Sequence, residues 1–418
     1  MSATVNFYSH RNDGHLRAML LAVMRYVVWS TVALLAILVA VVFPVLVVVS
    51  VILVIGFSFR SKPVVIGVAT TVVLGVFGWM NSMKGITNDW GWYTQHYLML
   101  RWLPFTDYWG HQIGIFAIKT SEPVYYFISS VVSKWTDGNI PVLAWVISAL
   151  IYIPLGVSVG LLSARMVKMP AHVGISILAA LMVGVTFTLT IQLVRQEIAN
   201  AFLCSGFALF YLGRRAIGLV LATLAVFTHN SAVAPFAVLI AVHFLAFSHG
   251  RPAWGRVALL WFGFIGFGVA FWMMGPGETY LDSAKSDGVI SPVVIVMDSV
   301  FLMVLLFLRS RLDATQGEMQ HFLDVLAVAS IVYSGFLIGI SPAPIPLLRM
   351  YFYVEMFRTL MVTSIVCALL NSRYGSIWAI PILLAAILYV EMRIASSPFW
   401  YGGGGIEHLL RPIILFDI

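Results

Sequence analysis

Apolar blocks of membrane-spanning length recur along the whole chain and are separated by short polar stretches. They begin with a run at 25–59 that is interrupted by Pro44, and continue at 64–82, 140–163, 172–191, 198–212, 216–229, 231–247, 257–275, 292–308, 321–341, 350–370 and 376–395. About 20 apolar residues form a helix that crosses a bilayer, and the first run is long enough for a hairpin of two helices. The pattern predicts an all-α, polytopic membrane bundle of about 13 transmembrane helices in a single domain over residues 1–418.

The composition supports this class of protein. The chain of 418 residues is 61% hydrophobic and 10% charged, with a mean hydropathy of +0.97, whereas soluble domains carry about 25% charged residues. A β-barrel would show short alternating segments instead of long apolar blocks. Cys204 and Cys367 lie inside apolar blocks and say nothing about the redox compartment. The net charge of +7 is assigned to cytoplasmic loops, so no nucleic-acid partner is expected.

The basic residues between the predicted spans give the orientation. When the spans alternate, the basic doublets all fall on one side, and these are Arg165/Lys168, Arg214/Arg215, Arg251/Arg256 and Arg309/Arg311. The positive-inside rule makes that side the cytoplasm of a plasma (inner) membrane. The longest polar segment, 83–139, then lies outside as an extracytoplasmic loop, with an amphipathic helix at 123–135. The N-terminus lacks a signal-peptide pattern, so the first span is expected to be an uncleaved anchor.

The polar cluster at 190–200 is the strongest candidate for a site. Arg195, Gln196 and Glu197 stand between the apolar blocks 172–191 and 198–212. Together these blocks hold about 40 residues, roughly 60 Å of helix, which fits two spans joined by a very short turn. Charge at membrane depth is costly and therefore indicates function, although an Arg–Glu pair also marks membrane surfaces.

The predicted outer loop contains a carboxylate among flat aromatic faces. Asp89 is followed by Trp90, Trp92 and Tyr93, and His111 lies further along the same loop. Sugar rings bind to aromatic faces and hydrogen-bond to carboxylates, so the loop is a candidate glycan site. An aromatic belt in the lipid headgroups would use the same residues.

Three further polar residues are predicted to lie on the same outer side. Glu122 precedes a proline at the start of a helical segment, where a carboxylate also compensates the helix dipole. His229, followed by Asn230 and Ser231, joins two short blocks; it is suited to binding a pyrophosphate oxygen or moving a proton, or else to hydrogen-bonding between helices. Arg349 is a candidate anion ligand, because a guanidinium binds phosphate oxygens in a bidentate manner.

Other charged residues fall inside the predicted spans. Tyr351, Glu355 and Arg358 share one helical face, and Glu355 and Arg358 are expected to neutralise each other. Scattered intramembrane carboxylates would suit an ion-coupled transporter, and these are Asp298, Asp324 and Glu391. The chain lacks paired broken segments at matching positions of two halves, so the transporter is the second interpretation.

The order of the motifs resembles a known family. NDWGWY, SEPVYYFI, LVRQEIANAF, FTHNSA and LLRMYFY follow one another over roughly 85–400, as in the EpsG family of Wzy-like polysaccharide polymerases. The recurring family elements fall here on Asp89, Glu122-Pro123, Arg195-Gln196 and His229-Asn230-Ser231. NDWGWY departs from the Gly-x-Asp-Tyr arrangement that is frequent in the family.

The resemblance implies an activity and its partners. Members join polyprenyl-pyrophosphate-linked oligosaccharide repeats, one as donor and one as acceptor, on the outer face of the membrane in exopolysaccharide, capsule or O-antigen synthesis. Polyprenyl pyrophosphate is released, and neither a cofactor, nor a nucleotide sugar, nor a metal is expected. Membrane lipid and a chain-length regulator protein are the other expected partners. Two alternatives stay open: a glycosyltransferase that uses polyprenyl-phosphate sugar, and a non-enzymatic transporter or flippase of lipid-linked glycan.

The candidate residues divide into three roles. Fixed cations and donors stabilise a departing pyrophosphate, and the candidates are Arg195, Gln196, His229 and Arg349. A carboxylate orients or deprotonates the acceptor hydroxyl, and the unranked candidates are Glu197, Asp89 and Glu122. Glycan contacts are expected from Trp90, Trp92, Tyr93, His111 and Tyr351. Helical spacing separates Glu197 from Arg195 by about 160°, so both serve one site only if the chain turns there.

Overall fold

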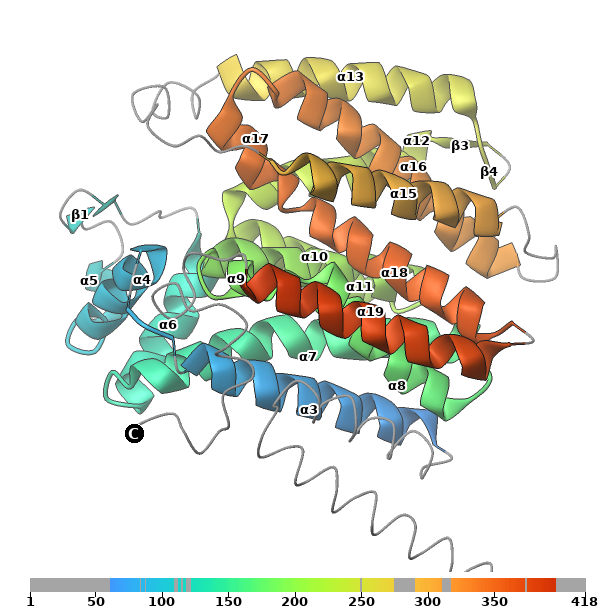
Figure 1. Cartoon of the computed structure of the whole chain (residues 1–418). Helices are drawn as coiled ribbons and strands as arrows, with labels where there is room; N and C mark the ends of the chain where they lie inside the picture. The colour runs from blue at the N-terminus through green and yellow to red at the C-terminus, as the bar shows by residue number, and fades with distance from the viewer. Residues whose placement is uncertain are drawn as a thin grey trace, which may run out of the picture.

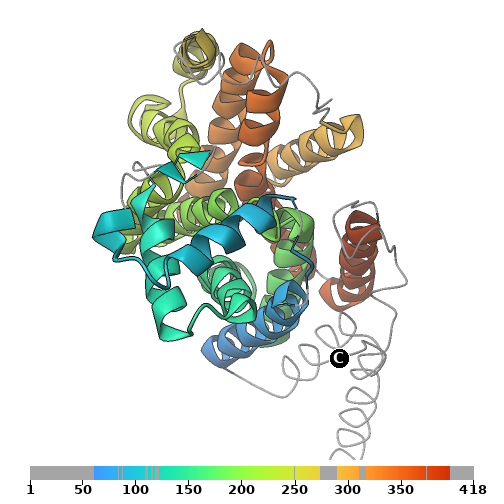
Figure 2. The same ribbon diagram turned by 90° about the vertical axis from the view of Figure 1, so that its left-hand side faces the viewer.

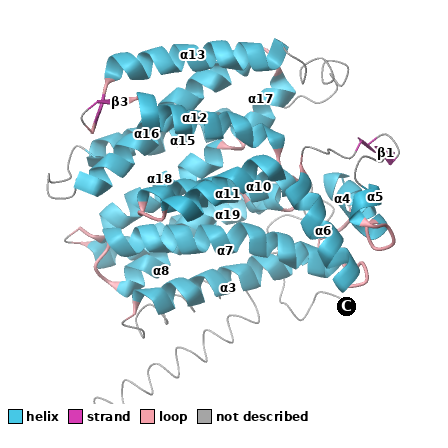
Figure 3. Cartoon of the chain, turned by 180° about the vertical axis from the view of Figure 1, so that it is seen from behind, coloured by secondary structure: helices cyan, strands magenta, loops and turns pink. Residues whose placement is uncertain are grey.

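The computed structural model describes the greater part of the chain from residue 61 to residue 395. The described residues are 61–82, 84–86, 88–108, 112–113, 116–117, 122–248, 250–273, 290–309, 317–372 and 374–395. The hairpin predicted at 25–59, His111, and the polar tail after residue 395 lie outside them. Within the described residues almost all regular structure is helical (Figure 3), which confirms the predicted all-α membrane bundle.

Each apolar block from residue 64 onward corresponds to helix. Six segments in the described residues are long and apolar enough to cross a membrane: Lys62–Ser82, Ile140–Met166, Trp254–Met273, Pro292–Arg309, Met319–Ile340 and Pro344–Leu370. Shorter apolar helices occupy Pro170–Gly184, Arg215–Thr228, Asn230–Leu245 and Ile377–Val390. The total of about 13 spans stays a prediction, because it includes the hairpin outside the described residues.

The elements follow the chain in simple order. The helices are α3 (Lys62–Ser82), α4 (Asn88–Met99), α5 (Phe105–Tyr108), α6 (Pro123–Trp135), α7 (Ile140–Met166), α8 (Pro170–Ala179), the π-turn η1 (Ala180–Gly184), α9 (Phe187–Thr190), α10 (Val194–Tyr211), α11 (Arg215–Thr228), the 3₁₀ turn η2 (Asn230–Ala232), α12 (Val233–Leu245), α13 (Trp254–Met273), α15 (Pro292–Arg309), α16 (Gly317–Ile340), α17 (Pro344–Tyr351), α18 (Val354–Leu370) and α19 (Gly375–Ala395). Two antiparallel hairpins complete them: β1 (Gln112–Ile113) with β2 (Phe116–Ala117), and β3 (Phe247–Ser248) with β4 (Arg251–Pro252).

Local sequence sets where several helices begin. Prolines occupy the first position of α6, α8, α15 and α17, where the missing N–H is no loss and the fixed φ suits a helix. Helix α7 begins after Asn139, whose side chain accepts a hydrogen bond from the Val142 N–H at 3.1 Å.

Two of the predicted spans are broken rather than continuous. Block 172–191 is divided into α8, η1 and α9, and block 350–370 is divided between the end of α17 and α18. The break in block 172–191 packs against α18: a Cβ added to Gly184 would lie 2.5 Å from the Thr359 Cα. Only glycine therefore allows α18 to approach the chain at this point.

The helices lie side by side, so the bundle has two distinct ends (Figure 1). At one end, α4, α5 and α6 lie near the start of α10 and near α17, and they face the viewer in the end-on view (Figure 2). Basic residues gather at the opposite end. There Lys62 Nζ donates to the carbonyls of Ala164 and Val167 at 2.7 Å each, and Arg165 Nη2 donates to the Leu212 carbonyl at 2.9 Å. This separation agrees with the alternation of spans that the basic doublets predict.

Candidate active site

Arg195 lies in the first turn of α10, immediately after the chain reverses direction. Helix α9 ends at Thr190 and α10 begins at Val194, so three residues make the connection. The predicted turn in the TIQLVRQEIAN stretch is therefore present. The N-terminus of an 18-residue helix also supplies partial positive charge, which favours anions at the same place as the guanidinium.

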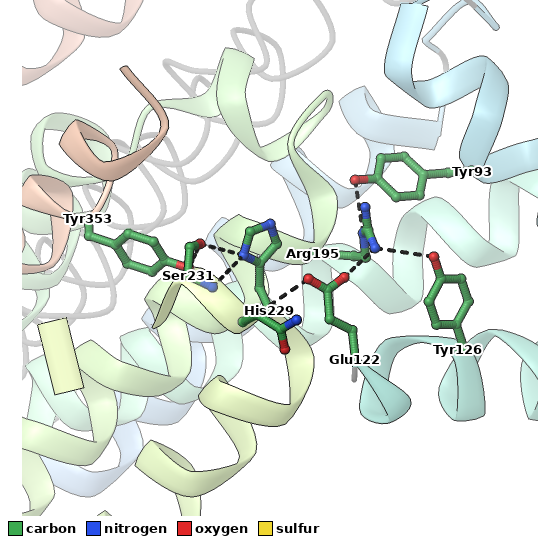
Figure 4. Close-up of polar contacts among 8 residues, drawn as sticks. Tyr93, Glu122, Tyr126, Arg195, His229, Ser231 and Tyr353 are labelled. Carbon is green, nitrogen blue, oxygen red and sulfur yellow. Dashed lines mark hydrogen bonds and ion pairs between the residues drawn. The ribbon is translucent and has the colours of Figure 1, made fainter. Parts of the chain in front are cut away.

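The guanidinium of Arg195 is held by three side chains from two other helices (Figure 4). Its Nη1 forms an ion pair with Glu122 and donates to the Tyr126 hydroxyl at 3.1 Å. Its Nε donates to the Tyr93 hydroxyl at 3.3 Å. The guanidinium carbon lies 5.5 Å and 5.7 Å from the ring centroids of Tyr93 and Tyr126, within cation–π range. Arg195 keeps 16% of its side chain exposed, so a fixed cation remains accessible at this end of the bundle.

Glu122 faces the arginine rather than its own helix. It occupies the N-cap position of α6 but makes no capping hydrogen bond with its side chain, which is 0% exposed. One carboxylate oxygen pairs with Arg195, and the other accepts from the Asn230 N–H at 3.3 Å. Helix-dipole compensation therefore does not account for Glu122, which joins α6 to the start of both α10 and η2.

His229 lies beside this ion pair, at the junction of α11 and η2 (Figure 4). Its Nδ1 accepts from the Ser231 N–H at 3.3 Å and lies 2.5 Å from the Ser231 hydroxyl, which is 3.0 Å from the Tyr353 hydroxyl. A backbone N–H can only donate, so Nδ1 is unprotonated and the proton is assigned to Nε2. In this tautomer His229 presents a hydrogen-bond donor, the role predicted for it toward a pyrophosphate oxygen.

Gln196 connects the cluster to α17. Its Nε2 donates to the backbone carbonyl of Arg349, whose side chain is half-buried. The predicted anion ligands Arg195, Gln196, His229 and Arg349 thus come from three separate helical regions that meet at one end of the bundle.

The fold places the outer-loop residues in different environments. Tyr93 belongs to the cluster, whereas Asp89 is exposed in the first turn of α4 and Trp92 is 41% exposed. Trp90 is buried, with Lys84 Nζ 3.3 Å from its ring centroid. Of the described glycan-loop candidates, only Tyr93 therefore contacts the arginine; His111 falls outside the described residues.

Comparison with known families gives one match. The model of the EpsG family matches residues 64–402. The chain belongs to the EpsG family. The match includes Tyr93, Glu122, Arg195 and His229, and membership supports a Wzy-like polysaccharide polymerase. Searches of curated proteins and of solved structures found no match.

Glu197 points to a different part of this EpsG-family protein. It is 1% exposed, and its carboxyl group lies within electrostatic range of Glu355 and Arg358 of α18 rather than of Arg195. Tyr351 is also elsewhere, because its hydroxyl donates to Asp298 at 2.7 Å. The structure thus brings Glu122, but neither Glu197 nor Asp89, into contact with Arg195.

The expected Glu355–Arg358 pair is present but secondary. Arg358 Nη1 lies 3.6 Å from the Glu355 carboxylate, whereas Asp298 receives two hydrogen bonds from Arg358, at 2.6 Å and 2.9 Å. The guanidinium is therefore engaged mainly by α15, not by its own helix.

Several residues of the site are not evident from single motifs. Tyr126 follows Glu122 by four residues, so one helical face carries both, and this spacing is the signal that identifies it. Lys84 donates to the Ile191 carbonyl at 2.8 Å and so ties the loop after α3 to the turn before α10; burial lowers the pKa of its ammonium group. In the described residues of this EpsG-family protein, no group of three or more His, Cys, Asp or Glu residues is placed to hold a metal ion.

Proposed function

We propose that this protein polymerises polyprenyl-pyrophosphate-linked oligosaccharide repeats on the outer face of the plasma membrane. The observation that carries the proposal is the Arg195–Glu122 pair beside His229, at the bundle end opposite the basic loops, in a chain of the EpsG family. A fixed guanidinium, a histidine donor and a helix N-terminus together suit a pyrophosphate.

In the proposed reaction, a hydroxyl of the acceptor glycan attacks the anomeric carbon of the donor. The new glycosidic C–O bond forms as the bond from the anomeric carbon to the pyrophosphate oxygen breaks, and the hydroxyl proton passes to a base. Polyprenyl pyrophosphate leaves with the bonding electrons. Negative charge grows on the leaving oxygen, where Arg195 and the Nε2–H of His229 stabilise it.

Glu122 is the carboxylate best placed to serve this reaction. It alone of the three candidates contacts the arginine, since Asp89 is exposed and Glu197 lies against Glu355. In the resting protein Glu122 compensates the guanidinium. When a pyrophosphate takes over that role, the carboxylate becomes available to orient the acceptor hydroxyl and receive its proton.

Replacement of the arginine tests the proposal. In cells that make the polymer, Arg195→Gln is expected to lower polymer formation by about 10²–10³-fold, the effect of removing one transition-state donor. Gel analysis of lipid-linked glycans should then show single repeat units that accumulate on the outer leaflet. A matched control is Arg101→Gln, because Arg101 also pairs with a carboxylate, Asp137, in the outer region but away from the cluster.

The outcomes separate the alternatives. Single repeats held on the inner leaflet would indicate a flippase, and full-length polymer lacking one sugar would indicate a transferase that uses polyprenyl-phosphate sugar. Normal polymer in both variants would contradict a role for Arg195 in any of these reactions.

A further inference from the structure

A second polar cluster is buried between α10, α15 and α18. Glu197, Glu355 and Arg358 are 1%, 3% and 3% exposed. Arg358 forms its two hydrogen bonds with Asp298, and Glu355 accepts from the Thr186 N–H at 3.2 Å. None of these contacts involves Arg195, so the cluster is separate from the candidate active site.

The charges of the cluster do not balance. Among the side chains that the structure describes, three carboxyl groups face the cluster, those of Asp298, Glu355 and Glu197, whereas Arg358 and Arg393 of α19 supply two guanidinium groups. The other described titratable groups that face it from neighbouring elements are neutral phenols, those of Tyr152, Tyr351, Tyr353 and Tyr389. If all of these carboxyl groups were ionised, one negative charge would stay uncompensated in the interior, which is strongly unfavourable.

One carboxylate oxygen of the cluster lacks a hydrogen-bond donor. Glu197 Oε1 is buried and finds no hydrogen-bond partner among the described residues. A bare carboxylate oxygen in such a place is unfavourable. The carboxyl group of Glu355 lies within electrostatic range of that of Glu197. Two neighbouring carboxylates repel each other, and this repulsion is removed when they share one proton.

We propose that Glu197 and Glu355 bind a single proton between them, which makes this carboxyl pair a buried proton-binding site joining α10 to α18. The proton supplies the missing donor and the missing positive charge at once. It also couples the two helices behind the candidate active site, since α10 carries Arg195 and α18 follows directly after Tyr353. Glu197 and Glu355 are therefore positioning residues for the cluster on the opposite face of α10.

The proposal makes a specific prediction about charge. Glu197→Gln leaves two carboxylates against two guanidinium groups, and so does Glu355→Gln, so each single variant is balanced without a proton. Both are expected to fold and to keep an unfolding temperature close to that of the unaltered protein. The double variant leaves one carboxylate against two guanidinium groups and is expected to unfold at a clearly lower temperature.

Infrared spectroscopy measures the proton directly. The purified full chain, in a detergent without ester groups at neutral pH, should show a carboxylic-acid carbonyl band that shifts in D₂O. Each single variant should lose that same band, because the remaining carboxylate is ionised. The matched control Asp324→Asn should leave it unchanged, since Asp324 is held as a carboxylate by Arg309 at 2.5 Å and 3.0 Å.

Several results would overturn the proposal. An acid band that persists in either single variant would mean that the carboxyl groups bind protons independently. Single variants that fail to fold would contradict the charge balance. If the acid band is absent and appears only when Na⁺ is removed, a metal cation rather than a proton occupies the site. The experiment measures no glycan chemistry, so its result is independent of the proposed polymerase activity.

Discussion

At the scale of single residues, the candidate site depends on a buried ion pair that remains partly accessible. A buried carboxylate or guanidinium is costly unless its hydrogen-bonding atoms are engaged. Glu122 uses both oxygens, toward Arg195 and toward the Asn230 N–H, and the guanidinium also reaches two tyrosine hydroxyls. This arrangement fixes the guanidinium in place, and a cation that is already oriented stabilises developing charge without reorganisation during the reaction.

The charge of Arg195 also affects a neighbouring histidine, which gives a pH-dependent prediction. Burial, and then the positive charge of Arg195, lower the pKa of His96 below its usual 6.5. The unfolded chain therefore binds the proton more readily than the folded protein. The contribution of His96 to the free energy of unfolding is fully present above pH 6.5. It is lost as the pH falls from 6.5 toward the lowered pKa.

Unfolding temperatures measured between about pH 7.5 and about pH 5.5 would test this prediction. The fall in unfolding temperature on acidification should be smaller in His96→Gln. It should also be reduced in Arg195→Gln, where the second cause of the shift is absent. Identical pH profiles for the original protein and His96→Gln would show that His96 contributes nothing to the acid sensitivity.

At the scale of helices, sequence periodicity locates the elements but not their breaks. Every apolar block after residue 64 is helical because each provides enough apolar surface and enough length. The interruption after Gly184 is different, because it depends on the approach of Thr359, which is far away in the chain. The glycine alone does not reveal this contact, and so block 172–191 reads as one continuous span.

Small residues also set the packing of α13 on α16, and this leads to a prediction. A Cβ added to Gly268 would lie 2.5 Å from the Phe336 carbonyl oxygen, a backbone atom that cannot yield easily. Gly268→Ala should therefore push α13 away from α16 and cost about 1–3 kcal/mol of stability.

The matched control lies two residues earlier on the same helix. A Cβ added to Gly266 has no atom within 4 Å, so Gly266→Ala should unfold no earlier than the original protein. Thermal unfolding of both variants in detergent measures the difference. Equal unfolding temperatures would mean that the close approach of α13 and α16 does not limit stability.

At the scale of the whole molecule, the sequence predicts which residues form the site better than it predicts the contacts between them. Arg195, Glu122 and His229 are predictable because a charged or titratable residue next to an apolar block is costly without a function. Their contacts with Tyr93 and Tyr126 are not predictable, because those contacts require α4 and α6 to fold back over the start of α10 (Figure 2). The same limitation leaves Glu197 indistinguishable from Glu122 until the helix geometry separates them.

The orientation of the bundle is a property of the whole molecule and leads to the last prediction. Two exposed lysines mark its opposite ends: Lys134 lies in the last turn of α6, at the end of the bundle that carries α4, α5 and α6, and Lys168 follows α7 among the basic residues. Because positive residues favour the cytoplasm, the Lys168 end is expected inside and the Lys134 end outside. A polymerase of lipid-linked repeats on the outer leaflet requires this orientation.

Cysteine labelling in spheroplasts measures the orientation with little background, because the native Cys204 and Cys367 are buried, at 1% and 0% exposure. A membrane-impermeant maleimide should label Lys134→Cys in intact spheroplasts and Lys168→Cys only after permeabilisation. The reverse pattern would place the Arg195 cluster in the cytoplasm. Since the lipid-linked repeats of the proposed reaction lie on the other leaflet, the proposed polymerisation would then be impossible at this site, whatever the chemistry of its side chains.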